Sequence, residues 1–106
     1  MKESKIIVNV SLDENNIPEK LKWEATDGGQ ELSESKAAFL SFWDLKTKET
    51  LRIDLWTKDM EADEMKHFFH QTLLSMSDTL ERAIGEEKMA GDLRDFCHHF
   101  SDKLLK

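Results

Sequence analysis

The sequence has few of the residues that crosslink or interrupt a chain. Its single cysteine, Cys97, excludes a framework of disulfide bonds within one chain and fits a reducing compartment. Its single proline, Pro18, follows a cluster of turn residues and begins a new segment, so it interrupts no strand. No internal repeat, low-complexity segment or long linker divides the chain. These absences favour an ordinary globular domain.

Long apolar runs are also missing. The first five residues are polar or charged apart from Met1, and only three apolar residues follow before the polar Asn9. The apolar core of a signal peptide is therefore absent. No apolar run approaches the length of a transmembrane helix. We expect a cytoplasmic protein that is not inserted into a membrane.

Positive charge is scarce. Lysine and arginine total 15 against 22 aspartate and glutamate residues, which gives a formal net charge of −7. The lysines of Lys20–Lys22 and Lys46–Lys48 are too few to form the basic patch of a nucleic-acid-binding protein. An acidic surface also disfavours anionic membranes. We expect no nucleic-acid partner, and a basic protein surface is the charged partner that this composition favours.

The first half of the chain alternates between apolar and polar residues, which is the period of β-strands. Four strands are expected between about residues 5 and 56, and the third, at residues 37–43, is apolar on both sides. Polar segments separate the strands: Asp13–Asn16, the loop from Asp27 and Gly28 to about Ser35, and Asp44–Glu49. The last of these is typical of a hairpin turn.

The second half repeats its apolar residues at steps of three and four, which is the period of a helix. Two helices are expected, at about residues 61–84 and 87–105, and Gly85 is the expected C-terminal stop of the first. Acidic residues open both helices, where negative charge interacts favourably with the helix dipole. The apolar stripes comprise Met65, Phe69, Leu73, Met76 and Leu80, and then Met89, Leu93, Phe96, Cys97, Phe100 and Leu104.

The order of elements predicts one α+β domain over residues 1–106, with a four-stranded antiparallel sheet followed by two C-terminal helices that pack on one face. The face that two helices leave uncovered is normally polar. Four apolar residues fall on that face instead: Ile7, Phe39, Trp43 and Trp56. We expect them to form an interface with another chain, in a homo-oligomer first of all. Two alternatives stay open: the loop near Gly28 covers them, or they are singly exposed, as apolar residues often are.

Four histidines raise the question of a metal site. Glu64 and His67, and likewise Asp95 and His98, have the carboxylate–histidine spacing of di-iron helical bundles. At about 100° per residue, however, His67 lies roughly 160° around its helix from Phe69 and points away from the apolar stripe. Because metal ligands in bundles point inward, we expect surface histidines and no metal.

Catalytic motifs are also absent. Cys97 lies at the edge of an apolar stripe, and the adjacent His98 points about 100° away on a helix, so it does not serve as a base for the thiol. A buried structural cysteine is expected instead. The Gly28-Gly29 pair is a turn signal, and no phosphate-binding, hydrolase or metalloprotease motif occurs. We expect neither catalytic residues nor a cofactor, and therefore no enzyme.

One stretch of the sequence is distinctive, because Leu51–Met60 (LRIDLWTKDM) runs almost directly into Asp63–Leu73 (DEMKHFFHQTL). Together with Trp23–Asp27 (WEATD) and Asp92–Cys97 (DLRDFC), it resembles the gliding motility protein C family, GldC, over nearly the whole chain. The resemblance implies a cytoplasmic accessory of the gliding apparatus of surface-moving bacteria. The resemblance implies a cellular process but no chemical activity, so it assigns no site residues.

Two functions are compatible with these features. The first is non-catalytic protein binding in the assembly or support of the gliding machinery, by a homo-oligomer that also contacts other motility proteins. The alternative is a chaperone that binds unfolded client proteins, since four antiparallel strands followed by two helices are similar to the export chaperone SecB, a likeness of fold alone. In that case Phe39, Trp43 and Trp56 hold extended apolar segments of the client.

Overall fold

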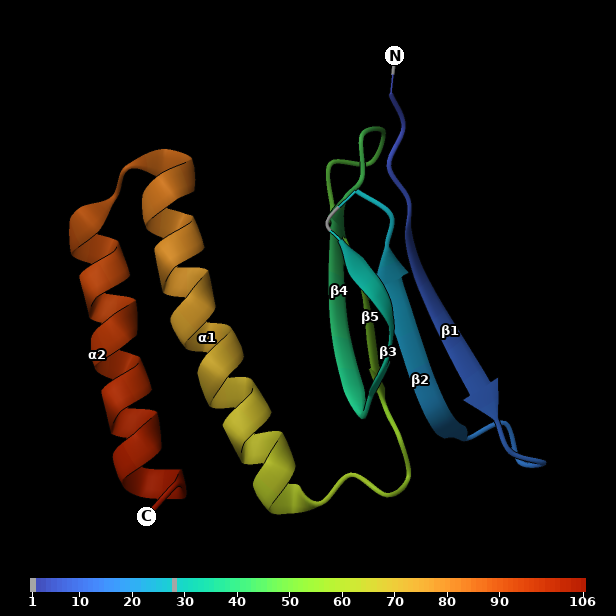
Figure 1. The fold of residues 1–106 in the computed structure, drawn as a ribbon. Coiled ribbons are helices and arrows are strands. Elements are labelled where there is room, and N and C mark those ends of the chain that lie inside the picture. The colour runs from blue at the N-terminus through green and yellow to red at the C-terminus, as the bar shows by residue number, and fades with distance from the viewer. Residues whose placement is uncertain (1, 28) are drawn as a thin grey trace. The chain divides into compact units, whose positions relative to one another are not determined.

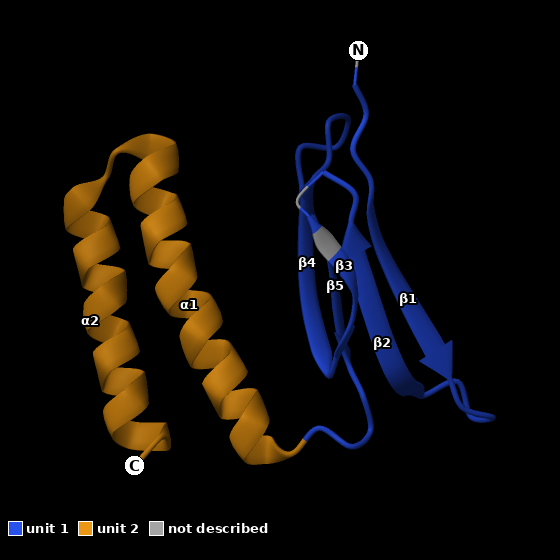
Figure 2. Ribbon diagram, viewed as in Figure 1, with its two compact units in different colours: residues 1–60 blue, residues 61–106 orange. Residues whose placement is uncertain are grey.

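A computed structural model describes residues 2–27 and 29–106 (Figure 1). In this part of the chain five strands come first and two helices follow, which confirms the α+β class. The chain divides into two compact units, Met1–Met60 with the strands and Glu61–Lys106 with the helices (Figure 2). The packing of the helices on a sheet face and the single domain over residues 1–106 stay predictions.

The first three strands form an antiparallel sheet in the order β1-β2-β3, with β1 at Ile6–Leu12, β2 at Pro18–Ala25 and β3 at Gln30–Ser35. The predicted alternation of β1 holds, because its even-numbered residues pair with the apolar residues of β2. Val8 lies opposite Trp23, and Val10 lies opposite Leu21. Leu21 is the buried residue of this face, with 1% of its surface exposed. The sheet therefore has one apolar face and one largely polar face.

The turn between β1 and β2 is fixed by Asp13. Its Oδ1 atom accepts hydrogen bonds from the backbone N–H of Asn15, at 2.8 Å, and of Ile17, at 3.1 Å. Asn16 takes the left-handed conformation with φ of 61°, which asparagine tolerates better than most residues. These bonds favour the ionised carboxylate and hold the pKa of Asp13 below its usual range, with help from the Lys58 ammonium group.

The expected polar loop up to Ser35 is wrong, because Gln30–Ser35 forms β3 and pairs with β2. Gly28, which was assigned to the same loop, lies outside the described residues. The sequence of β3 has only one apolar residue, Leu32, so it lacks the alternation that marks a half-buried strand. An edge strand can form without an apolar face because backbone hydrogen bonds to its neighbour hold it in the sheet. The neighbour of β3 is β2.

The predicted single sheet of four strands is also wrong. The strands β4, at Ala37–Trp43, and β5, at Thr50–Trp56, form a separate two-stranded antiparallel sheet. Only Lys36 separates β3 from β4, so the chain changes sheets at this residue. The two sheets are connected beyond β5, where the Lys58 N–H donates to the Pro18 carbonyl oxygen at 3.0 Å. Alternation identifies each strand but not its neighbours, which is why the sequence did not reveal the division.

The helices are α1, at Ala62–Ile84, and α2, at Glu87–Leu104, each within one residue of its predicted bounds. The Glu61 N–H at the start of α1 donates to the Glu64 side chain at 3.0 Å, so one otherwise unsatisfied backbone donor is paired. Gly85 ends α1 in the left-handed conformation, with φ of 70°, which confirms the predicted stop. The helices thus form an antiparallel hairpin with a very short connection.

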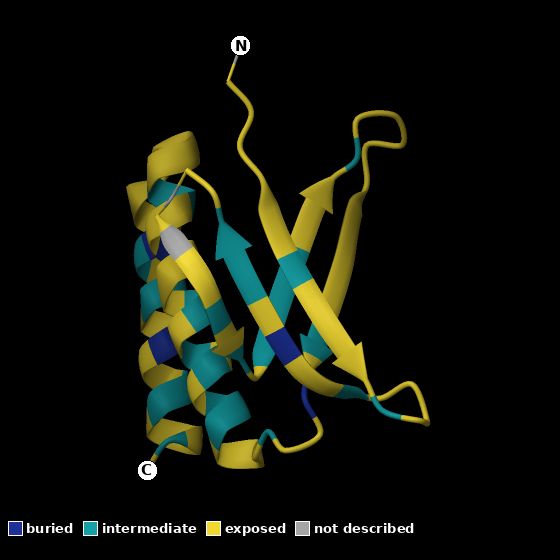
Figure 3. Ribbon diagram, turned by 45° about the vertical axis from the view of Figure 1, so that its right-hand side comes forward, coloured by how far each residue is buried: buried dark blue, intermediate teal, exposed yellow. Residues whose placement is uncertain are grey.

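Few residues of the described chain are buried (Figure 3). In the helical unit the buried ones are small: Ser77, Ala90 and Cys97. Large apolar residues of the predicted stripes stay exposed: Phe69, Met76, Met89, Phe96 and Leu104. The residues buried most completely in the helical unit are therefore small, and the unit leaves these larger apolar residues about half-exposed.

Candidate interaction surface

The geometry of the candidate surface is set by the hairpin turn between β4 and β5. Asp44 stabilises the turn, because its Oδ2 atom accepts the backbone N–H of Thr47 at 2.8 Å and the Thr47 hydroxyl at 2.9 Å. These hydrogen bonds lower the pKa of Asp44 from its usual value. Lys48 takes a positive φ of 57°, and the Asp44 N–H then donates to the Glu49 carbonyl oxygen at 2.9 Å. This turn fixes which residues of β4 and β5 lie opposite one another.

Register divides the hairpin into two faces. Leu40 lies opposite Ile53, and Phe42 lies opposite Leu51. This face is entirely apolar and comprises Ala38, Leu40, Phe42, Leu51, Ile53 and Leu55. Phe42, Leu51 and Ile53 are each about half-exposed, so the strand unit leaves much of this face uncovered. Covering it requires the helices or another chain.

The opposite side of the hairpin, called the aromatic face below, carries Phe39, Trp43 and Trp56. The structure therefore brings three of the four predicted interface residues onto one face of one sheet. Trp43 and Trp56 lie at opposite ends of that face, with 69% and 52% of their surfaces exposed, and Phe39 lies half-buried between them. Ile7 is separate from this group, since it belongs to β1 and lies opposite Glu24 in the other sheet.

A polar group that the sequence analysis missed occupies the middle of the aromatic face. The Arg52 guanidinium lies over the Phe39 ring, 5.9 Å from its centre, and its Nη2 atom donates to Asp54 at 2.7 Å. Its Nη1 atom donates to the Ser41 hydroxyl across the strand pair. A cation over an exposed aromatic ring contributes about 0.5–1 kcal/mol. The alternation of Arg52 and Asp54 in β5, opposite the aromatic alternation in β4, was the sequence signal for this arrangement.

The helical hairpin presents a second exposed apolar surface. Arg94 of α2 connects the helices, because it donates to Asp78 at 2.8 Å and to Glu81 at 3.1 Å, both on α1. These carboxylates raise the pKa of the Arg94 guanidinium further, so it stays charged. The apolar stripe residues Phe69 of α1 and Phe96 of α2 remain partly exposed in the same hairpin. Both units of the chain therefore leave large apolar side chains uncovered by their own elements.

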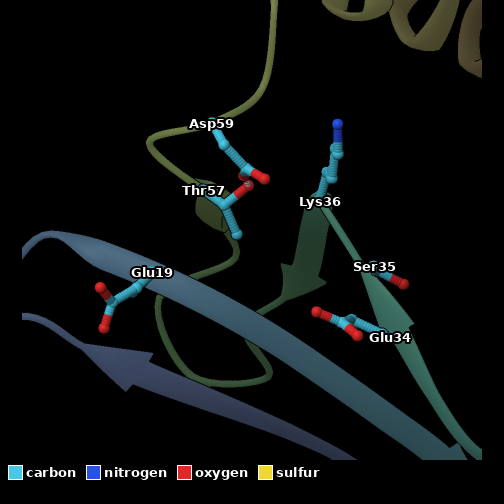
Figure 4. A pocket seen from close by; sticks show the side chains of 6 residues that line it. All are labelled: Glu19, Glu34, Ser35, Lys36, Thr57 and Asp59. Atoms are coloured by element: carbon cyan, nitrogen blue, oxygen red, sulfur yellow. Dashed lines mark hydrogen bonds between the residues drawn. The ribbon is translucent and has the colours of Figure 1, made fainter.

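A pocket of about 210 Å³ lies in the strand unit. It is lined by Glu19, Glu34, Ser35, Lys36, Thr57 and Asp59 (Figure 4). The buried Thr57 hydroxyl donates to Asp59, and the two side chains point toward each other, whereas Glu19 and Glu34 come from β2 and β3. The Thr57 hydroxyl, and secondarily the Lys36 charge, lower the pKa of Asp59. A carboxylate with a lowered pKa is a weak base, so this pair does not fit an activated nucleophile.

The histidines do not converge. His67, His98 and His99 are exposed, and His70 is half-buried with its ring 6.0 Å from that of Phe100. Among residues 2–27 and 29–106, no three His, Cys, Asp or Glu side chains gather where they could hold a metal ion. Cys97 is a buried free thiol, as predicted, and burial raises its pKa.

The fold and surface define a class of protein: small and acidic, of α+β type, with uncovered apolar surfaces on its strands and on its helices. The model of the gliding motility-associated GldC-like proteins matches residues 18–106. The chain therefore belongs to the GldC-like family, which confirms the resemblance inferred from its central stretch. No curated protein and no solved structure matches the chain. The strand β1 precedes the matched segment.

Membership of this family associates the protein with gliding motility. In the described residues neither helix has both the length and the apolar composition that crossing a bilayer requires.

Proposed function

We propose that the protein is a non-catalytic cytoplasmic accessory of the gliding machinery that acts through protein–protein contacts as a homo-oligomer. The observation that carries the proposal is the exposure of Trp43 and Trp56 on one face of the β4–β5 hairpin. Exposed tryptophan is rare on surfaces that stay in water, and aromatic residues are enriched in protein interfaces. Arg52 lies between them, and arginine shares this enrichment.

The number of apolar surfaces supports association between chains. The hairpin of β4 and β5 has one wholly apolar face and one aromatic face, and a single helical hairpin covers at most one of them. Whichever face the helices cover, the other needs a different partner. A second copy is always present at equal concentration, which makes it the first candidate.

The test is the molar mass in solution, measured by light scattering over a range of concentrations. A dimer or larger assembly is expected, and Trp43→Ala and Trp56→Ala should each dissociate it without unfolding the monomer. Leu45→Ala is the matched control, because Leu45 is 88% exposed in the turn outside the aromatic face. A monomer at all concentrations, or equal effects of the control and the tryptophan variants, would contradict the proposal.

The place in the gliding machinery has its own test. The tagged protein, purified from native gliding cells, is expected to recover motility or envelope components, and the Trp43→Ala variant should recover less of them. Recovery of none of these components by the wild-type protein would remove support for the process while leaving the oligomer unaffected.

A second candidate function is client binding, in the manner of an export chaperone. It is favoured by the spacing of exposed aromatic residues at both ends of the face, which suits an extended apolar segment. Suppression of the aggregation of an unfolded test protein at stoichiometric amounts, lost in Trp56→Ala, is the expected result. No suppression would eliminate this candidate.

A further inference from the structure

The first strand, β1, has an unpaired edge. The sheet order is β1-β2-β3, so in the described part of the chain β1 pairs with β2 alone. The Thr26 N–H donates to the Lys5 carbonyl oxygen at 3.1 Å, and the Lys5 N–H donates to the Thr26 hydroxyl at 3.0 Å, so the backbone groups of Lys5 point toward β2. Orientation alternates along an antiparallel strand. The N–H and C=O groups of Ile6, Val8 and Val10 therefore point outward.

This edge lacks the features with which proteins normally protect an edge strand. Exposed edges usually carry charged side chains, a proline or a bulge. The sequence of β1, IIVNVSL, has no charged residue and no proline, in a chain that is 35% charged. Its bulge comes only at the last step, between Ser11 and Leu12. By contrast, β3 at the other edge of the same sheet carries Glu31 and Glu34. Such an uncharged edge is a template for pairing with another strand.

We infer that β1 pairs antiparallel with β1 of a second copy about a twofold axis, which joins the two β1-β2-β3 sheets into one continuous sheet. This inference rests on the proposed homo-oligomer and adds a second contact between its copies, in the other sheet from the aromatic face. Outward-pointing residues must pair with each other, and a pairing centred on Asn9 satisfies this because Val8 of each copy then lies opposite Val10 of its partner. No rearrangement within either sheet is needed.

Charge at the two ends of β1 identifies the partner as a second copy. Lys2 and Lys5 precede the strand, and Asp13 and Glu14 follow it. In an antiparallel pair centred on Asn9, the Lys2–Lys5 end of each copy lies beside the Asp13–Glu14 end of the other, where the Glu14 side chain is exposed, whereas Asp13 already pairs with Lys58. The strand itself is neutral, so two chains with a net charge of −7 approach where their repulsion is least.

Apolar contacts add to the same arrangement. Ile6 and Leu12 are 73% and 51% exposed, the highest values among the apolar residues of β1. The pairing centred on Asn9 places Ile6 of each copy opposite Leu12 of the other, so these two side chains cover each other. Cross-strand apolar pairs of this kind stabilise antiparallel sheets.

The strand β4 also lacks charge and also has one unpaired edge. Its first four residues, Ala37–Leu40, are half-buried, whereas every residue of β1 except Val8 is exposed. The accessible length of edge is therefore greater in β1. The outward backbone groups of β4 belong to Phe39, Ser41 and Trp43, because the Lys36 carbonyl oxygen accepts from Thr57 across the pair with β5. Because different residues of β1 and β4 carry the outward backbone groups, hydrogen exchange of individual amides can show which edge is paired.

Amide hydrogen exchange, measured residue by residue by NMR, tests the inference. In the oligomer, the amides of Ile6, Val8 and Val10 should exchange about 100-fold more slowly than in the dilute monomer, because each gains an acceptor. The amides of Ile7 and Asn9 bond to β2 and should be protected at both concentrations, which makes them the internal control. Rapid exchange of Ile6, Val8 and Val10 in a stable oligomer would overturn the inference and leave the proposed oligomer intact.

Opposite charges introduced at position 9 in separate variants supply a second, independent test. Asn9 is exposed on the polar face of the sheet, so Asn9→Lys and Asn9→Asp are expected to fold with an unchanged circular dichroism spectrum. Each variant alone should associate several-fold more weakly than wild type, since like charges then meet at the twofold axis. A mixture of the two should form heterodimers above the statistical share, as counted by native mass spectrometry.

The outcomes separate the inference from the proposed function. Heterodimer preference at Asn9 together with unchanged mass of Trp43→Ala would support pairing through β1 and remove the aromatic face from self-association. A purely statistical mixture, or protection of the Phe39, Ser41 and Trp43 amides in place of those of β1, would overturn pairing through β1. A protein that stays monomeric at all concentrations would overturn both.

Discussion

At the scale of single residues, the two glycines of the helical unit differ in whether the backbone needs glycine. Gly85 ends α1 with φ of 70°, a conformation that other residues adopt at a cost. Gly91 lies inside α2 with nothing within 4 Å of the position that a Cβ atom would occupy. The same substitution at the two sites should therefore change stability in opposite directions.

The first prediction is that Gly85→Ala lowers the free energy of unfolding by about 1–2 kcal/mol because alanine is strained in the left-handed region. Its matched control, Gly91→Ala, should raise it by about 0.5–1 kcal/mol because alanine favours the helix. Urea denaturation followed by circular dichroism measures both values. A destabilising Gly91→Ala would indicate that its space is filled in the assembled protein.

The second prediction concerns the pH dependence of stability through Asp44. Hydrogen bonds from Thr47 lower the pKa of the folded carboxylate below its ordinary value of 3.8. Its stabilising contribution is therefore complete above that value and is lost as the pH falls through the folded pKa. The melting temperature of Asp44→Asn should thus lie below that of wild type at pH 7 and should change less below pH 4. Asp92→Asn, which removes one carboxylate at an exposed position of α2, is the matched control for the change in net charge.

The third prediction concerns Cys97. The thiol is buried among the helices and its pKa is raised, so little thiolate is present and reagents do not reach it. A thiol reagent at pH 8 should react with the folded protein at least about 100-fold more slowly than with the protein in 8 M urea, since reaction then requires opening of the hairpin. Equal rates would mean that Cys97 is accessible in the folded protein.

At the scale of elements, the residues buried most completely in the hairpin of α1 and α2 are small. Ser77 and Ala90 are completely buried, and large apolar residues stay partly exposed. A helix pair of this kind has no room at its centre for a larger side chain. The size of residue 90 should therefore control the stability of the hairpin.

The fourth prediction is that Ala90→Leu lowers the free energy of unfolding by about 1–3 kcal/mol, as overpacking does. Ala83→Leu adds the same atoms at an exposed position of α1 and should have little effect. Chemical denaturation of both variants at equal protein concentration provides the comparison. Equal midpoints would show that the helices separate readily to admit the larger side chain.

At the scale of the whole molecule, association should stabilise the fold. The apolar faces of both units are incompletely covered by their own elements, and an oligomer covers more of them than a single chain. Mass action then makes stability depend on protein concentration. Salt should strengthen the effect, since it screens the repulsion between chains of net charge −7.

The fifth prediction is that the melting temperature rises with protein concentration and that the rise is larger at 0.5 M than at 0.05 M NaCl. Differential scanning calorimetry over a hundredfold range of concentration measures it. The Trp43→Ala variant should show a smaller dependence than the Leu45→Ala control. A melting temperature independent of concentration for wild type would contradict the oligomer.

Most elements could be predicted from the sequence because their signals are local. Alternation predicted β1, β2 and β5, a run that is apolar on both sides predicted β4, and the repeat of Met65 and Phe69 with their neighbours predicted α1. The strand β3 was missed because its polar residues follow no such period, and only pairing with β2 makes it a strand. Of the candidate surface, Phe39, Trp43 and Trp56 were predicted to share a face and do so, whereas Arg52 and the separate place of Ile7 were not foreseen.

The sequence by itself determined the class of the fold, the helices, the buried state of Cys97 and the family, since periodicity, capping residues and motifs are properties of short segments. Tertiary structure alone decided how the strands divide into two sheets at Lys36, because hydrogen bonding between strands depends on contacts that are distant in sequence. It also decided that β1 has an unpaired edge with no charge along it. A strand lies at a sheet edge when no other strand pairs with its free side, and its own residues do not show whether such a neighbour exists.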